Sequence, residues 1–137
     1  MLFSKTAEYA LRILSFMAKE DIELFPADYL HKKLDIPQRY LRRLMTDPIR
    51  SGLILSIRGR NGGFSFAKDP SGIYVSDIIT TIDGSNVLNP CIMGFEECAL
   101  KNPCPMHELW KETHERIINT LTSVTLSYMD RSRASLK

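Results

Sequence analysis

The chain has 137 residues, of which 44% are hydrophobic and 25% are charged, so we expect a folded globular protein rather than a disordered one. It contains no run of about 18 apolar residues and no basic segment followed by an apolar block at its start, which argues against a membrane span and a secretory signal. We expect a cytoplasmic protein whose three cysteines stay reduced, so metal or redox chemistry is favoured over a structural disulfide.

Three helices are predicted in the first third of the chain. Apolar residues recur at helical spacing from Thr6 to Lys19, and a second helix is predicted from Pro26 to about Leu34. Pro37 disfavours a helical conformation at the residue before it and can open a third helix, which reaches about Thr46. We expect Pro48 to end or kink this third helix near Asp47.

A β-hairpin and a short helix are predicted next. Residues 53–58 and 64–67 read as strands on either side of Gly59–Gly63, whose Gly and Asn residues suit a turn with a basic tip. A helix from about Ser76 buries isoleucines and stops at Asp83–Gly84.

One long helix is predicted from about Met106 to Met129. Its apolar positions recur at steps of three and four residues and form a stripe longer than a domain of this size can cover. We therefore expect two copies of the chain to associate through this helix. The stripe comprises Met106, Trp110, Thr113, Ile117, Leu121, Val124 and Tyr128.

The order of these elements predicts a mostly α fold with a small β-hairpin, in the form of a winged helix-turn-helix plus a long C-terminal dimerisation helix. We divide the chain into a DNA-binding domain (residues 1–84), a cysteine loop (85–105), and a dimerisation helix with its tail (106–137).

Charge and side-chain chemistry indicate DNA as the partner. Residues 1–68 hold 12 Lys or Arg against 7 Asp or Glu, whereas residues 69–137 hold 6 against 9. Arginine pairs with guanine in the major groove, glutamine pairs with adenine, and arginine also favours narrow minor grooves. The alternative is that these arginines only solvate a helix face and a turn. The predicted DNA-binding residues are Gln38, Arg39, Tyr40, Arg42 and Arg43 on the third helix and Arg58, Arg60 and Asn61 at the wing.

The cysteines suggest a metal centre. Six residues separate Cys91 from Cys98, five separate Cys98 from Cys104, and His107 follows two residues further on. These gaps lack the close cysteine pairs of structural zinc sites and ferredoxins, and they suit a loop around an iron–sulfur cluster held by three thiolates. The fourth position is either completed by His107 or by Glu8 from a partner chain, or left as an open, reactive iron. The alternatives are three incidental thiols, a helix-terminal histidine and an exposed carboxylate.

The chain contains a set of motifs at residues 6–12, 36–41, 51–53 and 58–64, together with the three cysteines. In combination they resemble the Rrf-two (Rrf2) family of winged-helix regulators, which includes iron–sulfur repressors of the IscR and NsrR type. The resemblance implies a homodimer whose long helices cross, with each cluster near the partner's first helix and a ligand at Glu8 or His107. The six-residue cysteine gap and Pro48 depart from the family pattern.

We therefore expect a homodimeric regulator of transcription, most simply a repressor, that binds a double-stranded DNA operator. It senses iron–sulfur status, nitric oxide or redox state through a two-iron or four-iron cluster, which aerobic handling can strip. One rival keeps the DNA reader but senses thiol oxidation or a metabolite without a cluster. Another is a small electron-transfer protein. We expect no catalytic residues and no enzyme activity, because no acid–base pair or nucleophile arrangement is recognisable.

Overall fold

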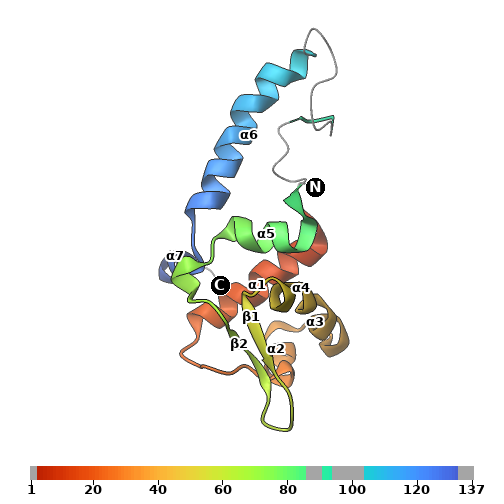
Figure 1. Ribbon diagram of the computed structural model, residues 1–137, viewed down its shortest axis with the longest axis vertical. Helices are drawn as coiled ribbons and strands as arrows, with labels where there is room; N and C mark the ends of the chain where they lie inside the picture. The colour runs from red at the N-terminus through yellow and green to blue at the C-terminus, as the bar shows by residue number, and fades with distance from the viewer. Residues whose placement is uncertain (1–2, 86–90, 94–103, 133–137) are drawn as a thin grey trace.

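The computed structural model describes residues 3–85, 91–93 and 104–132. A group of helices and one hairpin surrounds a single core, and one long helix rises away from it (Figure 1). This bears out the predicted fold class. The elements are α1 (Lys5–Lys19), α2 (Ala27–Leu34), α3 (Gln38–Leu44), α4 (Thr46–Arg50), β1 (Ile54–Ile57), β2 (Gly63–Phe66), the 3-10 turn η1 (Pro70–Gly72), α5 (Val75–Asp83), α6 (Pro105–Ser123) and α7 (Leu126–Ser132).

Helix α1 crosses the middle of the molecule and carries much of the core. Ser4 caps its start, where the Ser4 hydroxyl accepts a hydrogen bond from the Ala7 backbone N–H at 3.0 Å. Its buried face consists of Ala7, Ala10, Ile13, Leu14 and Met17. The helix packs against both α5 and α7, so it connects the first part of the chain with the last.

The turn between α2 and α3 is fixed by backbone and side-chain contacts. Helix α2 ends at Asp35, which adopts the left-handed conformation with φ 54°. The His31 ring donates a hydrogen bond from Nδ1 to the Ile36 carbonyl oxygen at 2.6 Å. Ile36 is fully buried, and Pro37 precedes the first residue of α3. This helix-turn-helix holds α3 at the surface of the core.

The predicted end of the third helix was slightly wrong. Helix α3 ends at Leu44, the chain turns at Met45, and a separate short helix, α4, contains Pro48. Proline lacks the N–H that a continuous helix would need at this position, and it is tolerated in the first turn of a new one. Met45 is fully buried, so the change of direction lies on the core rather than in solvent.

The hairpin, here called the wing, pairs β1 with β2 antiparallel, from Ile54 opposite Phe66 to Ile57 opposite Gly63. A bridge between Phe25 and Phe64 ties the wing to the segment before α2, with backbone hydrogen bonds of 2.7 and 2.8 Å. A Cβ at Gly63 would lie 2.5 Å from the Phe25 carbonyl oxygen. The close approach therefore requires glycine at this position.

The prediction of one continuous helix from Met106 to Met129 was wrong. Helix α6 ends at Ser123, Val124 is extended, and α7 begins at Leu126. The break occurs because the backbone here pairs with the segment before α5: the Val75 N–H donates to the Val124 carbonyl at 2.9 Å and the Leu126 N–H donates to the Ile73 carbonyl at 3.0 Å. Leu126 is fully buried, so α7 returns to the core.

Helix α6 buries few side chains for its length. His114 is its one buried side chain among the described residues, whereas Met106 and Leu109 are 40% and 68% exposed. In Figure 1 this helix projects from the remainder of the chain. No helix within the described ranges is both long and apolar enough to span a membrane.

Candidate nucleic-acid interface

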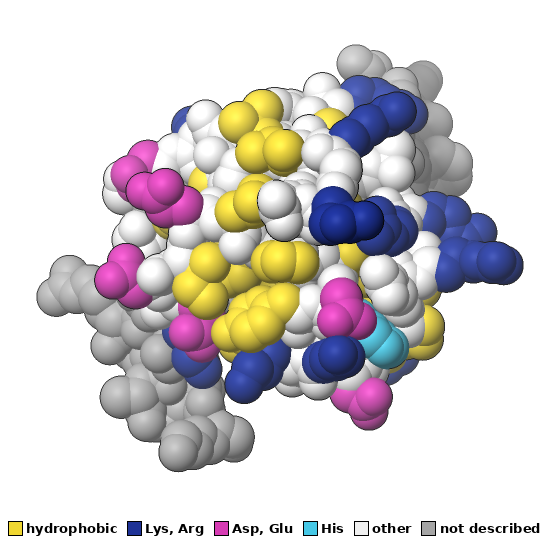
Figure 2. Space-filling model, turned by 90° about the horizontal axis from the view of Figure 1, so that it is seen from below, with side chains coloured by type: hydrophobic (Ala, Val, Ile, Leu, Met, Phe, Trp, Pro, Cys, Tyr) yellow, Lys and Arg dark blue, Asp and Glu magenta, His cyan; other side chains and the backbone are white. Residues whose placement is uncertain are grey.

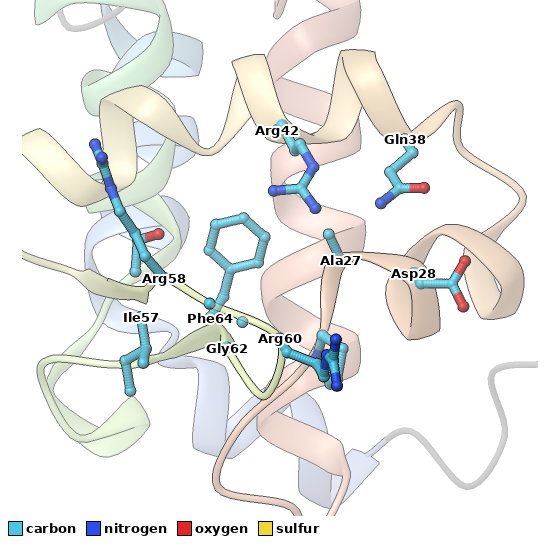
Figure 3. Close-up of a pocket in the computed structure, with 13 residues that line it drawn as sticks. Ala27, Asp28, Gln38, Arg42, Ile57, Arg58, Arg60, Gly62 and Phe64 are labelled. Carbon is cyan, nitrogen blue, oxygen red and sulfur yellow. The ribbon is translucent and has the colours of Figure 1, made fainter.

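A hollow of about 440 Å³ lies between the start of α2, helix α3 and the wing, and is called the reading hollow below. It brings together parts of the chain that are far apart in sequence (Figure 3). Four of the eight predicted DNA-binding residues line it. The lining consists of Pro26, Ala27, Asp28, Gln38, Arg42, Ser56, Ile57, Arg58, Gly59, Arg60, Gly62, Gly63 and Phe64.

Helix α3 supplies one side of the reading hollow. Gln38 and Arg42 are four residues apart, so they lie on the same face of the helix, and in Figure 3 both side chains point toward the wing. Arg39 and Arg43 are exposed but do not line the hollow. They occupy neighbouring positions on the helix surface, so any contact that they make with a DNA duplex lies beside the hollow.

The wing supplies the opposite side. Arg58 and Arg60 are exposed and lie on either side of Gly59, which has a φ of 109°. The Gly62 N–H donates to the Gly59 carbonyl at 3.0 Å and closes the turn. Asn61 is exposed within this turn and lies outside the lining of the hollow. The tight turn therefore presents two guanidinium groups across from α3.

The arginines of the reading hollow have no protein counter-charge. The ion pairs within the described residues involve Lys5, Lys32 and Arg50, and none involves Arg42, Arg58 or Arg60. Such unpaired cations on a surface attract a polyanion. Figure 2 shows the face that bears the wing tip, with Lys and Arg gathered mainly on one side, acidic side chains mainly on the other and a hydrophobic row between them.

Asp28 is the one acidic residue in the lining, and sequence reasoning missed it. Its carboxylate pairs with Lys32 at 3.0 Å on the exposed surface of α2. Its place directly after Pro26 and Ala27, in the first turn of a helix that leads into a helix-turn-helix, was the available signal. Phe64 was missed as well, because its predicted role was only that of a strand residue.

Tyr40 occupies a different position from the other predicted DNA-binding residues. Its hydroxyl is 3.2 Å from the Thr6 hydroxyl, and its ring meets Tyr9 edge-to-face at 5.5 Å between centroids. The side chain is half-buried between α3 and α1. Tyr40 therefore connects the recognition helix with the core and does not line the reading hollow.

Part of the predicted metal site lies within the described residues. Cys91 and Cys104 are half-buried, while Cys98 lies outside the described residues. Cys104 is the N-cap of α6, and the His107 N–H donates to the Cys104 carbonyl at 2.9 Å. This turn brings the backbones of a cysteine and a histidine together at the start of the helix, and both residue types are ligands that soft metals accept.

The other candidate ligand, Glu8, lies on α1 with its side chain 35% exposed and 3.7 Å from the Lys5 ammonium group. Within the described residues no three His, Cys, Asp or Glu side chains come together as a metal site. The structure therefore brings together Cys104 and His107 but does not join them to Glu8 in one chain.

Comparison with known proteins decides the family. A family model named Rrf2, described as an iron-dependent transcriptional regulator, matches residues 3–131. The chain belongs to the Rrf2 family. A putative helix-turn-helix transcriptional regulator from Aquifex aeolicus is 30% identical over 128 residues, which cover 92% of this chain and 89% of that protein. These relatives are transcriptional regulators, so the expectation that the chain is no enzyme is confirmed.

Other relatives place this Rrf2 protein near known regulators. IscR from Yersinia pseudotuberculosis is 35% identical over 102 residues, which cover 74% of this chain and 62% of that longer protein. The structure of CymR, the global cysteine regulator of Bacillus subtilis, matches with a TM-score of 0.81, 24% identity and coverage of 95% and 96% of the two chains. IscR from T. potens matches with a TM-score of 0.74 and 22% identity, covering 98% and 90%. These two likenesses establish a shared fold.

Proposed function

We propose that this Rrf2 regulator binds double-stranded operator DNA as a homodimer, with α3 in the major groove and the wing on the adjacent backbone or minor groove. The observation that carries the proposal is the convergence of Gln38, Arg42, Arg58 and Arg60 around one hollow, where none of the three arginines forms an ion pair with a described residue. Arg42 and Gln38 suit base edges, since their side chains share one face of a surface helix. Arg58 and Arg60 suit phosphates or a narrow minor groove.

The dimer in this proposal forms through α6. This helix projects from the core and exposes Met106 and Leu109, whose burial against a second α6 would remove apolar surface from water. Two chains related by a two-fold axis present two copies of α3 to the same face of a duplex. Readers about 34 Å apart then fit successive major grooves of a near-palindromic operator.

The signal in this proposal reaches the protein through the cysteines. Cys91, Cys98 and Cys104 hold an iron–sulfur cluster, and His107 or Glu8 of the second chain supplies the remaining ligand. Support comes from the two half-buried cysteines, the turn shared by Cys104 and His107, and the sequence relationship to IscR. Such a centre would be oxidisable, and its state would respond to nitric oxide, oxygen and the supply of iron.

A second candidate keeps the DNA reader and senses thiol oxidation or a metabolite directly. Cys91 and Cys104 are half-buried in the described part of the chain, and a cysteine thiolate can be oxidised without a metal. The fold is also shared with CymR, which is named a cysteine regulator. This candidate differs from the first only in the absence of a cluster.

Two experiments test the proposal. Binding of a duplex selected from a random pool, followed by fluorescence anisotropy at several salt concentrations, should show steep salt dependence. We expect Arg58→Ala to reduce the slope of log affinity against log salt by about 1, if Arg58 neutralises one phosphate. Lys19→Gln, which removes a charge outside the reading hollow, should leave the slope unchanged. Equal slopes in the wild type and Arg58→Ala would contradict the placement of the wing.

The second experiment concerns the cysteines. Anaerobically purified protein should be brown, contain iron and sulfide, and absorb at about 400 nm, as thiolate-bound clusters do. Replacement of each cysteine by alanine should remove this absorbance and alter the DNA response. A colourless protein without iron, prepared with iron supplied, would select the thiol- or metabolite-sensing candidate. The DNA-binding measurement is independent of that outcome.

A further inference from the structure

Two hydrogen-bonded contacts meet in the first turn of α1, which is called the joint below. One connects Ser4 with Asp83 at the end of α5, and the other connects Thr6 with Tyr40 on α3. The partners are 79 and 34 residues apart along the chain. The joint therefore fixes both the recognition helix and α5 to the same turn of backbone.

On the α5 side, the Asp83 carboxylate accepts two hydrogen bonds from Ser4. The Ser4 backbone N–H donates to Oδ2 at 3.0 Å, and the Ser4 hydroxyl donates to Oδ1. The same hydroxyl oxygen accepts from the Ala7 N–H, which completes the N-cap of α1. A carboxylate at the last residue of α5 is thereby tied to the first turn of α1 by two directional bonds.

On the α3 side, Tyr40 makes a hydroxyl contact and a ring contact with the joint. Its hydroxyl is 3.2 Å from the Thr6 hydroxyl. Its ring meets Tyr9 edge-to-face, with an interplanar angle of 79°, and the Arg12 guanidinium lies 5.2 Å from the centre of the Tyr9 ring. Edge-to-face rings and stacked guanidinium groups both prefer defined orientations.

Tyr40 is placed where it controls the rotation of α3. It follows Gln38 by two residues and precedes Arg42 by two, so about 200° of helix rotation separates it from the side that faces the wing. Helix α3 spans only Gln38–Leu44 and buries only Leu41 and Leu44. Apolar packing alone allows a two-turn helix to rotate slightly, whereas a hydrogen bond on the opposite side restricts that rotation.

We propose that Tyr40 is a positioning residue, which holds α3 through Thr6 and Tyr9 so that Gln38 and Arg42 point into the reading hollow. This inference rests on the proposed DNA-binding function and specifies how its reader is oriented. Asp83 anchors the same joint to α5. Gly84 and Ser85 directly follow Asp83 and lead into the predicted cysteine loop, so the joint connects the start of that loop with the reader.

The test uses the full chain and two duplexes of equal length, one selected by the wild type from a random pool and one unrelated to it. Tyr40→Phe removes the hydroxyl and keeps the ring. Loss of one hydrogen bond should weaken binding of the selected duplex by about 2- to 10-fold. Binding of the unrelated duplex and the salt slope should stay unchanged, because the arginines remain. Thr6→Val should give the same result from the other side of the bond.

Tyr29→Phe is the matched control, since Tyr29 is a half-buried tyrosine on α2 whose ring contacts Phe16 and Phe25 and which does not line the reading hollow. It should bind both duplexes like the wild type. Amide hydrogen exchange of the DNA-free proteins adds a second readout: α3 should exchange faster in Tyr40→Phe than in Tyr29→Phe.

Asp83→Asn tests whether the two halves of the joint act together. We expect Asp83→Asn to weaken binding of the selected duplex less than Tyr40→Phe does. In the double variant, the fold-loss of affinity should be smaller than the product of the two single fold-losses. Independent losses would overturn the role of Asp83.

The remaining outcomes separate the inference from the function on which it rests. If Tyr40→Phe behaves like Tyr29→Phe in binding and exchange, Tyr40 is not a positioning residue. Equal weakening on both duplexes would also overturn the inference, because it would identify Tyr40 as a backbone contact. If the wild type selects no duplex at all, the proposed function fails first, before any variant is compared.

Discussion

The winged part of the chain and its C-terminal helix α6 differ in how completely they are folded by contacts within one chain. Residues of α1 to α5 and the wing share a continuous core, in which Ile13, Leu30 and Ile78 are fully buried. Helix α6 buries only His114 among its described residues and exposes large apolar side chains. A single chain therefore buries one continuous core in the winged part, whereas it leaves most of α6 exposed or half-buried.

Helix α7 connects these two parts, and Leu126→Ala should have the largest effect on stability. Leu126 is fully buried, and its backbone N–H bonds to Ile73. Truncation of such a side chain should lower the free energy of unfolding by about 2–4 kcal/mol. Urea unfolding followed by circular dichroism measures this loss. Leu55→Ala, at a leucine 52% exposed on the wing, is the control, and similar losses in both variants would contradict the anchoring role of α7.

Gly63→Ala tests how firmly the wing is held to the core. The added Cβ would lie 2.5 Å from the Phe25 carbonyl oxygen, and because this is backbone it cannot move away cheaply. We expect a loss of about 1–3 kcal/mol in unfolding free energy, together with weaker DNA binding. Gly72→Ala, where the nearest atom belongs to the flexible Lys68 side chain at 3.2 Å, provides the comparison. Equal unfolding free energies of the two variants would show that the backbone at Phe25 can shift to accommodate the added Cβ at little cost.

Leu109→Glu addresses the other part of the comparison. Leu109 is 68% exposed on α6, and a charge there should oppose burial against a second chain. We expect the dimer dissociation constant to rise by roughly tenfold, equivalent to about 1.4 kcal/mol. Sedimentation at several concentrations measures it, with Leu55→Glu on the wing as the control. If the first variant dimerises like the wild type, the interface is elsewhere.

The smallest expected effect concerns Asp69, which caps the 3-10 turn after the wing. The Ser71 hydroxyl and backbone N–H both donate to its carboxylate and lower the pKa of Asp69. Because the folded-state pKa lies below the unfolded value, the stabilisation is present above the unfolded pKa and is lost as the pH falls through the folded pKa. The unfolding temperature of the wild type should therefore be higher than that of Asp69→Asn at neutral pH, and the two temperatures should converge in acid. A constant difference would exclude the carboxylate as its cause.

Local sequence patterns were sufficient for most elements. The stripe of α1, the Asp35–Pro37 break, the Gly-rich turn of the wing and the Asp83–Gly84 stop each depend on nearby residues, and the structure confirms these elements. The end of α3 and the continuity of α6 were predicted less well. The chain turns at the buried Met45 and starts a new short helix that contains Pro48, and Val124 pairs with a segment that is far away in sequence.

The basic residues of α3 and the wing were identifiable from sequence, because they belong to residue types that bind DNA and occur at the expected places. Some of these residues line the reading hollow and others lie beside it. Which of them do so on α3 depends on how this helix is rotated against the core. That rotation is fixed by Thr6 and Tyr9, which local periodicity does not relate to Tyr40. Sequence alone thus determined most of the elements and their chemistry. Tertiary structure decided where two helices end and which side chains meet, since packing joins residues that no local pattern connects.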